Sequence, residues 1–324
     1  MFQRKPLVDY HSIERVFEQV RCALGPEVQV TTVILPYESQ GIPNHLRNIV
    51  FAWKHRGPVN HITGDVHYIA LLLPRRRTML TVHDLASVAR LSGFRRALFL
   101  LLWYRLPVLA VSTVTVISEW TKAELVSLIP RADRKTVVVY NPVSSGLRAT
   151  TRPNREVPVV LQVGTGSTKN LQRVVEAVRG LQVHLRIIGH LSPEQSAHLA
   201  ASEISFSNTS NLSDEELNDE YEACDLVTLV STYEGFGLPI VEAQAAGRPV
   251  VTSKAAAMPE IAGAGALLVD PLSVEEIRSA IARVLSDTSL WLSLVLAGHD
   301  NLRRFSVSTT SRAYTSLYRS LGSP

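Results

Sequence analysis

The 324-residue sequence predicts an α/β fold of two doubly wound domains, each with a parallel sheet wrapped by helices. Short runs of β-branched residues alternate with helical patterns along the chain, which is typical of parallel sheets. The length suits two cores of about 150 residues each. Residues 144–158 are rich in Ser, Thr, Gly and Pro and lack apolar periodicity, which predicts a linker. We therefore expect domains at residues 1–150 and 151–305, followed by a helical segment at 306–324.

The N-terminal half contains five short apolar runs that predict strands. Between the last two runs, a polar segment predicts a helix in which Thr121 and Glu124 have the spacing of a capping box. Pro130 is expected to end this helix, because proline cannot donate a backbone hydrogen bond. The predicted strands are residues 28–34, 59–63, 78–82, 113–117 and 136–140.

The C-terminal half repeats the alternation with clearer boundaries, since most helical patterns end at Gly or a turn. Ligands of doubly wound folds bind at the carboxyl ends of the strands, so we expect the site there. The predicted strands are residues 159–164, 183–189, 225–230 and 248–253, and the predicted helices are residues 169–180, 192–201, 213–224, 238–247 and 273–285.

The composition is that of an ordinary globular protein, with 46% hydrophobic and 19% charged residues, and it argues against extensive disorder. The two cysteines, Cys22 and Cys224, are far apart, which predicts neither a disulfide framework nor a metal cluster. The most apolar stretch, residues 97–111, contains Arg105 and Pro107 and is shorter than the roughly 20 residues of a membrane span. We expect it to be a buried helix, and the protein to be cytoplasmic.

Charge is distributed unevenly between the halves. Residues 1–150 hold 19 Lys and Arg against 10 Asp and Glu, whereas residues 151–324 hold 14 against 19. A basic half indicates an anionic partner, such as acidic lipid headgroups or a phosphate-bearing acceptor. Residues 75–77 with Arg95 and Arg96 predict a basic face for peripheral contact with the inner face of a membrane; the alternative is solvated surface arginines. We expect no nucleic-acid partner.

The most informative segment is residues 231–252, STYEGFGLPIVEAQAAGRPVVT, where a strand enters a glycine-containing loop and then a helix. Gly235 and Gly237 allow the backbone to approach a ligand without Cβ clashes. Pro239 suits a first helical position, and Gly247 a left-handed helix end. The amides at the start of this helix favour an anion such as a diphosphate.

Two glutamates of this segment predict contacts to other parts of the same ligand. A helix end contributes only about 0.3–2 kcal/mol, so additional cations are expected. Glu242, predicted in the first turn of the helix, is close enough to reach a ribose, and Glu234 in the loop reaches toward a sugar. The alternative is an ordinary strand–loop–helix turn with two exposed glutamates.

Taken together, EGFGLPIVEAQAAGRPVVTS (residues 234–253) and MPEIAG (residues 258–263) resemble the retaining glycosyltransferases of family 4, which have the GT-B fold. The resemblance covers roughly residues 60–321 and is strong in the C-terminal half, whereas the first 58 residues match weakly. Its other segments are VHDL (82–85), VTVISEWTKAEL (114–125), VVYNPV (138–143) and VLQVGTGSTKNL (160–171).

This resemblance implies two Rossmann-like domains facing a cleft, with the C-terminal helix packing back on the N-terminal domain. It also implies that residues 187–190 and 211–217 line the base pocket. The implied site residues are Gly164, Thr165, Gly166, Lys169, Phe236, Gly237 and Leu238 at the donor diphosphate, Glu242 at the ribose, and His83 and Glu234 as catalytic residues at the sugar.

The sequence departs from the family pattern in two places. Members commonly have an arginine soon after the strand glycine of the phosphate loop, where this chain has Thr165 and Gly166. Lys169 is then expected to be the only cationic side chain on the diphosphate. The glycine-rich loop near the N-terminus is replaced by GIPNHLRN (residues 41–48), which leaves the acceptor side undefined.

Competing motifs are weaker. VGTGSTK (residues 163–169) resembles a dinucleotide loop, but Lys169 stands where the third glycine belongs, and no acidic residue follows the next strand. Adjacent residues His83 and Asp84 point in different directions from a strand, so Asp84 is expected to orient a turn rather than bind metal. His83 is alternatively a hydrogen-bonded core histidine. No metal or cofactor is expected to be required.

The expected function is retaining transfer of a hexose from a nucleotide-diphosphate sugar to a glycan, lipid-linked or small-molecule acceptor. GDP-mannose, UDP-glucose and dTDP-rhamnose all remain open as donors. The alternatives are a GT-B nucleotide-sugar epimerase or hydrolase, and a catalytically inactive partner subunit.

Overall fold

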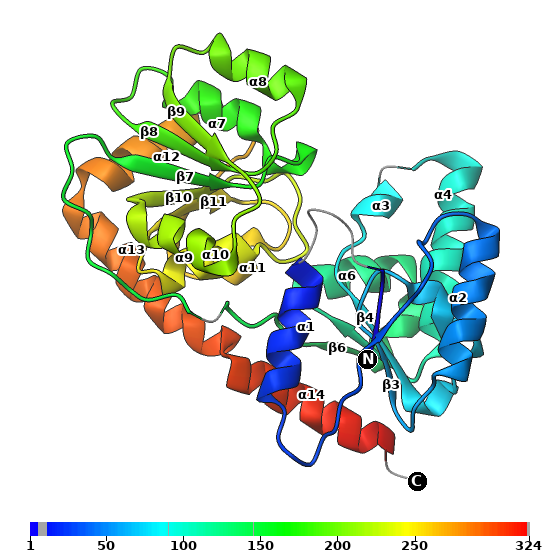
Figure 1. Cartoon of the computed structure of the whole chain (residues 1–324). Coiled ribbons are helices and arrows are strands. Elements are labelled where there is room, and N and C mark those ends of the chain that lie inside the picture. The colour runs from blue at the N-terminus through cyan, green and yellow to red at the C-terminus, as the bar shows by residue number, and fades with distance from the viewer. Residues whose placement is uncertain (6–11, 90, 145, 323–324) are drawn as a thin grey trace. The chain divides into compact units, whose positions relative to one another are not determined.

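The computed structural model describes residues 1–5, 12–89, 91–144 and 146–322. The chain divides into two compact units, of which the N-terminal unit is Met1–Pro142 with Ser306–Pro324 and the C-terminal unit is Val143–Phe305. Each unit is built on its own six-stranded parallel sheet (Figure 1). The predicted α/β class, with two parallel sheets, is confirmed.

The N-terminal sheet has the strand order β2-β1-β3-β4-β5-β6. β4 lies inside the sheet, and all five of its residues are buried. The strands are β1 (Phe2–Gln3), β2 (Val33–Ile34), β3 (Asn60–Ile62), β4 (Thr78–Val82), β5 (Thr113–Val116) and β6 (Thr136–Val138). The helices are α1 (Ser12–Ala23), α2 (Ile42–Lys54), α3 (Ala86–Ala89), α4 (Gly93–Phe99), α5 (Leu106–Ala110), α6 (Glu119–Leu128) and α14 (Val307–Gly322), with shorter turns η1 (His67–Leu72), η2 (Arg75–Arg77) and η4 (Pro130–Lys135) and a π-helix, η3 (Leu100–Arg105).

Two local predictions in this unit were wrong. Residues 28–34 form a strand only at Val33–Ile34, because this edge strand pairs with β1, which is itself two residues long. The capping box at Thr121 and Glu124 does not form. Helix α6 begins earlier, at Glu119, and the side chain of Ser118 caps it by accepting a hydrogen bond from the amide of Thr121. Pro130 ends the helix as predicted.

Residues 97–111 are largely helical, as predicted, but one side of this helical segment is exposed, so the prediction of a buried helix was wrong there. The segment is formed by α4, η3 and α5, and Leu100 is its only buried leucine, whereas the other five leucines are exposed. Pro107 lacks an amide to bond the carbonyl of Trp103, and a π-helix occupies this point. Nδ1 of the buried His67 donates to that Trp103 carbonyl at 3.1 Å, which satisfies the freed acceptor.

The C-terminal helix α14 belongs to the N-terminal unit, as the family resemblance implied. It contacts α1 and fixes its register through buried polar groups. The hydroxyl of Tyr318 lies 2.7 Å from Nδ1 of the buried His61, and Thr310 donates to the carbonyl of Tyr140 at 3.0 Å.

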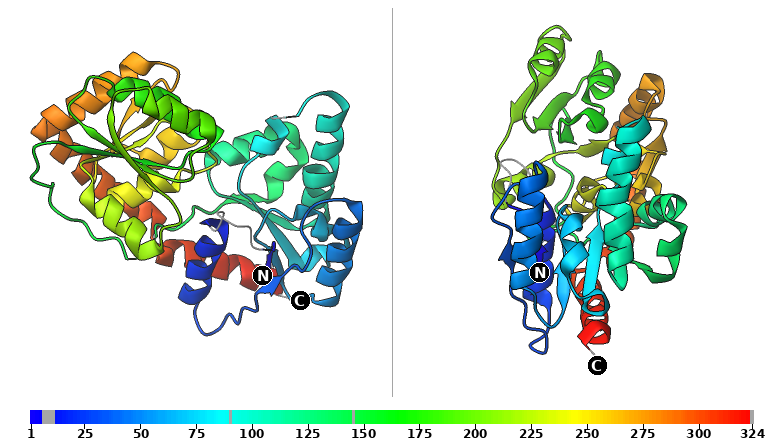
Figure 2. Two further views of the ribbon diagram at one scale, coloured as in Figure 1. Left: turned by 45° about the horizontal axis from the view of Figure 1, so that its top comes forward. Right: turned by 90° about the vertical axis from the view of Figure 1, so that its right-hand side faces the viewer.

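The C-terminal sheet has the strand order β12-β11-β10-β7-β8-β9, and helices cover both of its faces (Figure 2). Helix α7 packs with α12, and α10 packs with α11 and α13. The strands are β7 (Val159–Val163), β8 (His184–Ile188), β9 (Ser205–Thr209), β10 (Leu226–Leu229), β11 (Val250–Ser253) and β12 (Ala266–Val269). The helices are α7 (Leu171–Val178), α8 (Pro193–Ala200), α9 (Asp214–Ala223), α10 (Leu238–Ala245), α11 (Met258–Ala262), α12 (Val274–Ser286) and α13 (Thr288–Asn301), with turns η5 (Ser167–Lys169) and η6 (Leu302–Phe305).

The described residues of the stretch 144–158 contain no helix or strand, and Ser145 lies outside the described residues. The stretch is nevertheless fixed to the C-terminal unit. Arg248, which is 1% exposed, donates to the carbonyls of Thr150 and Thr151 at 3.1 and 3.2 Å. The buried guanidinium of Arg248 therefore holds the start of the C-terminal unit in place.

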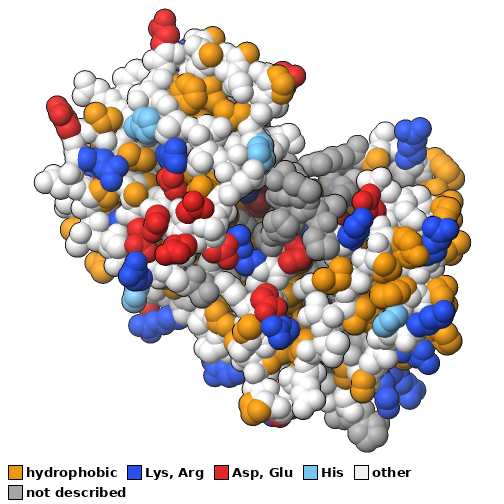
Figure 3. Space-filling view, in the orientation of Figure 1, with side chains coloured by type: hydrophobic (Ala, Val, Ile, Leu, Met, Phe, Trp, Pro, Cys, Tyr) orange, Lys and Arg blue, Asp and Glu red, His pale blue; other side chains and the backbone are white. Residues whose placement is uncertain are grey.

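The surfaces of the two units differ in charge. Acidic side chains gather over α9 in the C-terminal unit, whereas over α2 in the N-terminal unit basic side chains lie among hydrophobic ones (Figure 3). In the described part of the chain no single helix is long and apolar enough to cross a membrane, and Val274–Ser286 with Thr288–Gly322 passes that test only as a bent pair.

Candidate functional site

The carboxyl edge of the C-terminal sheet has a topological switch point between β7 and β10. From β7 the chain winds outward through β8 to β9, and from β10 it winds the other way through β11 to β12. The loops that leave β7 and β10 therefore diverge and leave room for a ligand between neighbouring strands. Every predicted diphosphate residue lies on one of these two loops, except Leu238, which is the first residue of α10.

The loop after β7 is shaped around the side chain of Lys169. Gly164 has φ +90, and a Cβ there would lie 2.9 Å from Cε of Lys169, so the close approach requires glycine. The buried side-chain amide of Gln162 donates to the carbonyls of Gly164 and Lys169 at 3.3 and 3.1 Å. Asn170, at φ 60, donates to the carbonyl of Val230 at 3.0 Å. The loop is thus held at both ends and attached to β10.

The loop after β10 leads into helix α10. Gly237 has φ +94, and a Cβ there would lie 3.2 Å from Ile240 and 3.3 Å from Leu229, so this turn also requires glycine. Pro239 lies in the first turn and no side chain caps the helix start. Gly247, at φ +72, follows the helix end, as predicted. The amino end of α10 therefore offers backbone amides and a positive dipole end at the switch point.

The two loops contact each other directly. The amide of Thr232 donates to the carbonyl of Thr168 at 2.8 Å. Nζ of Lys169 lies 2.8 Å from Oε1 of Glu234, and Ser231 donates to the same carboxylate oxygen at 2.9 Å. The Lys169 and Glu234 side chains are 21% and 18% exposed, so this ion pair is shielded but reachable from solvent. The predicted diphosphate cation and the predicted sugar carboxylate therefore lie together.

Glu242 is one turn further into α10 than predicted, because α10 begins at Leu238 and has no acidic residue in its first turn. It is only 6% exposed. Ser144 donates to Oε1 at 2.6 Å, and Tyr221 donates to Oε2 at 2.7 Å. A carboxylate offers about four lone-pair sites, so each oxygen retains capacity for a ligand hydroxyl.

The segments predicted to line a base pocket, residues 187–190 and 211–217, meet at the ends of β8 and β9. Nε2 of His190 lies 3.0 Å from Oδ1 of Asn211. The hydroxyl of Thr165 donates to the carbonyl of His190. Gln195 in turn donates to the carbonyl of Thr165 at 2.7 Å. Thr165 therefore links the phosphate loop to these segments, although its position is commonly occupied by arginine in the resembled family.

His83 lies in the other unit, at the carboxyl end of β4. Its Nε2 donates to the carbonyl of Thr63 at 2.8 Å, which leaves Nδ1 as the acceptor atom in the neutral ring. Burial lowers the pKa of His83 below its ordinary value. The carboxylate of Asp84 accepts from the amide of Ala86 at 3.0 Å, so Asp84 orients the turn into α3, as predicted. The catalytic role of His83 stays a prediction.

Residues 146–296 match the family of glycosyl transferases group 1. This segment of the chain is therefore similar to that family. The matched residues lie within the C-terminal unit and include both loops of the switch point. The glycines that shape those loops are thus part of the matched segment.

Two relatives each match about a third of the chain. A stretch of 128 residues, 36% of the chain, is 35% identical to the MMP alpha-(1->4)-mannosyltransferase of Mycolicibacterium hassiacum and covers 31% of it. A stretch of 109 residues, 33% of the chain, is 34% identical to the D-inositol 3-phosphate glycosyltransferase of Corynebacterium urealyticum and covers 26% of it. The chain thus matches about a third or less of the length of these relatives.

A solved structure extends the likeness to the whole chain. Anabaena HepE in complex with UDP-glucose superposes with a TM-score of 0.79 at 17% identity, over 98% of this chain and 99% of that one. At this identity the likeness concerns the fold, which is GT-B. The predicted GT-B fold is confirmed.

Sequence reasoning missed the partners of the buried carboxylate and the anchors of the phosphate loop. Tyr221 faces the core from an otherwise acidic helix, at i+4 from Leu217, and that spacing was a usable signal. Ser144 lies in a stretch without apolar periodicity, and no sequence signal indicated its contact with Glu242. Gln162 is a single polar residue in an apolar strand, which indicates a structural or functional role.

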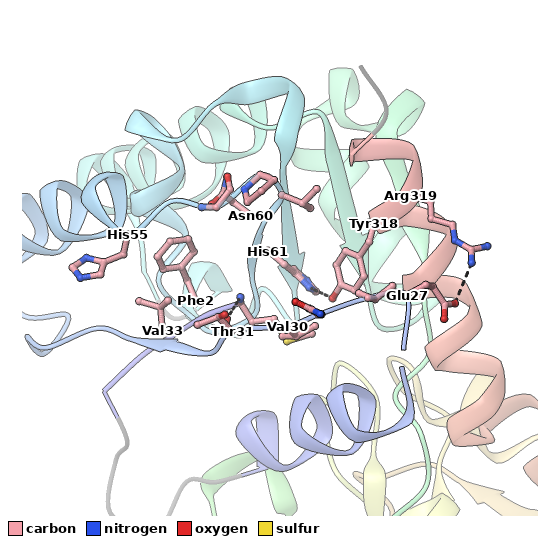
Figure 4. Close-up of a pocket in the computed structure, with 16 residues that line it drawn as sticks. Phe2, Glu27, Val30, Thr31, Val33, His55, Asn60, His61, Tyr318 and Arg319 are labelled. Carbon is pink, nitrogen blue, oxygen red and sulfur yellow. Dashed lines mark hydrogen bonds and ion pairs between the residues drawn. The ribbon is translucent and has the colours of Figure 1, made fainter. Parts of the chain in front are cut away.

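The N-terminal unit contains a cavity of about 460 Å³ (Figure 4). It lies at the amino ends of the strands, whereas His83 follows the carboxyl end of β4. The walls of the cavity include Phe2, Val33, Asn60 and His61, at the amino ends of β1, β2 and β3. Ligands of doubly wound sheets bind at carboxyl ends, so this cavity is not a candidate for the site. Among the described residues no group of three or more His, Cys, Asp or Glu side chains is arranged to hold a metal ion.

Proposed function

We propose that this chain is a retaining glycosyltransferase that transfers a hexose from a nucleoside-diphosphate sugar to a glycan, lipid-linked or small-molecule acceptor. One observation carries the proposal: Lys169, the uncapped start of α10 and the carboxylate of Glu242 follow one another at a single switch point. A cation, an amide cluster and a carboxylate in this order suit a diphosphate joined to a ribose.

Donor binding in this proposal begins with an exchange of partners at Lys169. In the free protein its ammonium lies against Glu234. A diphosphate at the start of α10 attracts this ammonium, and Glu234 is then released toward the hydroxyl groups of the sugar. Because the lysine is already folded back over Gly164, little side-chain entropy is lost when the donor binds.

Glu242 contributes orientation rather than charge neutralisation. Its oxygens already accept hydrogen bonds from Ser144 and Tyr221, which fix the carboxylate plane. Ribose hydroxyls would donate to the remaining lone pairs, and hydrogen bonds to a charged group contribute about 1.5–3 kcal/mol each. The base would then lie toward His190 and Asn211, which meet next to the phosphate loop.

In the transfer step the bond between the anomeric carbon and the diphosphate oxygen breaks, a bond between that carbon and the oxygen of an acceptor hydroxyl forms, and the hydroxyl proton passes to the departing diphosphate. Negative charge develops on the departing nucleoside diphosphate. Lys169 and the dipole of α10 face that charge and stabilise it. His83, kept neutral by burial, would act on the sugar as a hydrogen-bonding group through Nδ1.

UDP-glucose is the first donor to test, because HepE was solved with it, and GDP-mannose follows from the mannosyltransferase relative. We expect one nucleotide sugar of a panel that includes dTDP-rhamnose to raise the melting temperature. A ligand at one hundred times its dissociation constant stabilises by about 2.7 kcal/mol. Its turnover should require an acceptor. Consumption of donor without acceptor indicates an epimerase or hydrolase instead, and binding of no donor contradicts the proposal.

A further inference from the structure

The helical run from α4 through η3 to α5 exposes apolar side chains on the face that points away from the core. Leu100, Tyr104 and Val108 are buried beneath it. On the outer face Phe94 is 80% exposed and Leu102 is 45% exposed, with Leu98, Leu101, Leu106 and Leu109 also exposed. Isolated exposed leucines are ordinary in soluble proteins, but a row of them on one helical run marks an interaction surface.

Helix α2 adds a second apolar row. Ile42, Leu46, Val50 and Trp53 are spaced four, four and three residues apart, which places them on one side of the helix. All four are exposed, Ile42 at 73% and Leu46 at 58%. The opposite side of α2 contains the buried Asn48, Ile49 and Ala52.

The two rows belong to neighbouring elements. The ring of His45 on α2 lies 5.4 Å from Trp103 on η3, and Tyr68 on η1 lies 5.0 Å from Trp103. η1 packs against both α2 and α5 and exposes Leu71 and Leu72. We call the outer side of α2, η1 and the α4–α5 run the apolar–basic face.

The charged residues of this face have one sign. Between Ser39 and Ser118 the sequence holds ten Lys and Arg but only two acidic residues, Asp65 and Asp84. Within the described residues, Arg47 and Arg56, on and just after α2, and Arg95, Arg96 and Arg105, on the α4–α5 run, form no ion pair with a carboxylate. Both acidic side chains are engaged locally, by Trp103 and by the amide of Ala86.

We propose that the apolar–basic face docks peripherally on an anionic lipid bilayer, with α2 and the α4–α5 run lying in the interfacial plane. A bilayer with acidic headgroups offers two matching environments. The apolar side chains of both rows would insert into its acyl region, and the arginines would lie against its negatively charged headgroups. Trp53, stacked under Arg56 at 4.5 Å, has the amphipathic character of an interfacial anchor. The proposal does not depend on the proposed function, because it concerns binding alone.

Cosedimentation of the full chain with vesicles tests it. We expect at least tenfold tighter binding to vesicles of phosphatidylcholine with 30% phosphatidylglycerol than to phosphatidylcholine alone. Raising NaCl from 0.1 to 0.5 M should weaken the binding, because surface charges are screened. Ile42→Gln with Leu46→Gln, and separately Arg95→Gln with Arg96→Gln, should each lower the bound fraction at least fivefold.

Matched controls come from the C-terminal unit. Leu292 and Leu296 on α13 are 51% and 70% exposed, and the side chains of Arg148 and Arg303 are 80% and 83% exposed. Leu292→Gln with Leu296→Gln, and Arg148→Gln with Arg303→Gln, should bind vesicles like the unmodified chain. Circular dichroism of every variant checks the fold.

Three outcomes overturn the proposal. The unmodified chain stays in the supernatant with anionic vesicles, or the variants of the face and the controls lose binding equally. The third is a dimer in light scattering without lipid, abolished by Ile42→Gln with Leu46→Gln, which would make the face a contact between two copies.

Discussion

At the carboxyl edge of the C-terminal sheet, ionised side chains pair with one another, as Lys169 and Glu234 do at 2.8 Å. At the corresponding edge of the N-terminal sheet, His83 donates to a backbone carbonyl, and burial lowers its pKa. Burial also holds the pKa of His61, deeper in that unit, well below its ordinary value. The carboxyl edge of the N-terminal sheet thus combines a neutral histidine with an ion pair of its own, Arg4 with Glu14 at 2.8 Å, whereas the switch point of the C-terminal sheet relies on ionised groups.

In the proposed function this difference is a division of labour between binding the diphosphate and orienting the sugar. Groups that bind a diphosphate must be charged, and a salt bridge that a ligand can exchange keeps them in place without deep burial. Groups that orient a sugar need fixed tautomers instead, and the carbonyl of Thr63 fixes that of His83.

Lys169→Ala removes the cation of the charged edge. We expect turnover to fall roughly 100-fold, because removing one stabiliser of developing negative charge typically costs this much. Initial-rate kinetics with a saturating donor measure it. Lys254→Ala is the matched control, since Lys254 also pairs with a glutamate, Glu276 at 3.0 Å, but on a different loop. Equal losses in both variants would remove the special role of Lys169.

Glu242→Ala tests the ribose contact. We expect the dissociation constant of the donor to rise about 10- to 100-fold with a smaller change in turnover, because charge-assisted hydrogen bonds contribute about 1.5–3 kcal/mol. Titration calorimetry measures it. Ser144→Ala removes only a supporting donor and should weaken binding less. Unchanged affinity in Glu242→Ala, with a folded protein, would mean that the carboxylate is purely structural.

The glycine pattern made the switch point predictable from sequence, because Gly164, Gly237 and Gly247 all have positive φ. β9 and α13 were not predicted. β9 is polar and half-exposed, so apolar and polar residues hardly alternate along it. Helix α13 has apolar residues on its exposed side, including Leu292 and Leu296, which obscures its buried face. Sequence periodicity does not predict a helix or strand whose apolar residues do not all face one core.

The site itself was predictable only in part. Loop residues could be assigned because glycines and a helix start leave a signature in the local sequence. The partners of Glu242 could not, since Ser144 and Tyr221 are 98 and 21 residues away and meet it only through tertiary packing. The burial predicted for residues 97–111 was partly wrong for the same reason. It was inferred from hydrophobicity alone, whereas tertiary packing decides which of these side chains are exposed.

Gly164→Ala sharpens the comparison at the backbone level. A non-glycine residue at positive φ costs roughly 1–2 kcal/mol, and the added Cβ would displace Lys169. We expect lower stability together with weaker donor binding. Gly166→Ala is the control, because its φ is −55 and a Cβ there meets nothing within 4 Å. Stability should then remain within error of the unmodified chain.

The neutral groups of the N-terminal unit predict a pH dependence. In the unfolded chain His61 becomes protonated when the pH falls below its ordinary pKa of about 6.5. In the folded chain its pKa is lower, so it stays neutral to a lower pH. Stability from this group is therefore complete above about pH 6.5 and is lost as pH falls toward the lowered pKa. Between pH 7.5 and 5.5 we expect a loss of roughly 1 kcal/mol.

Denaturant unfolding followed by circular dichroism measures this loss. His61→Gln should show a shallower decline with falling pH, although its stability at pH 7.5 is lower. The exposed His55→Gln should retain the full slope. A slope unaffected by His61→Gln would contradict the assignment of a buried neutral histidine.

The account rests on a diphosphate held between the two loops of the switch point. A crystal structure of the chain with the nucleoside diphosphate of its best-stabilising donor tests this most directly. The predicted complex has the phosphates within hydrogen-bonding distance of Nζ of Lys169 and of the amides that start α10, with the ribose on Glu242. A nucleotide bound elsewhere, with the Lys169–Glu234 pair intact, would contradict it.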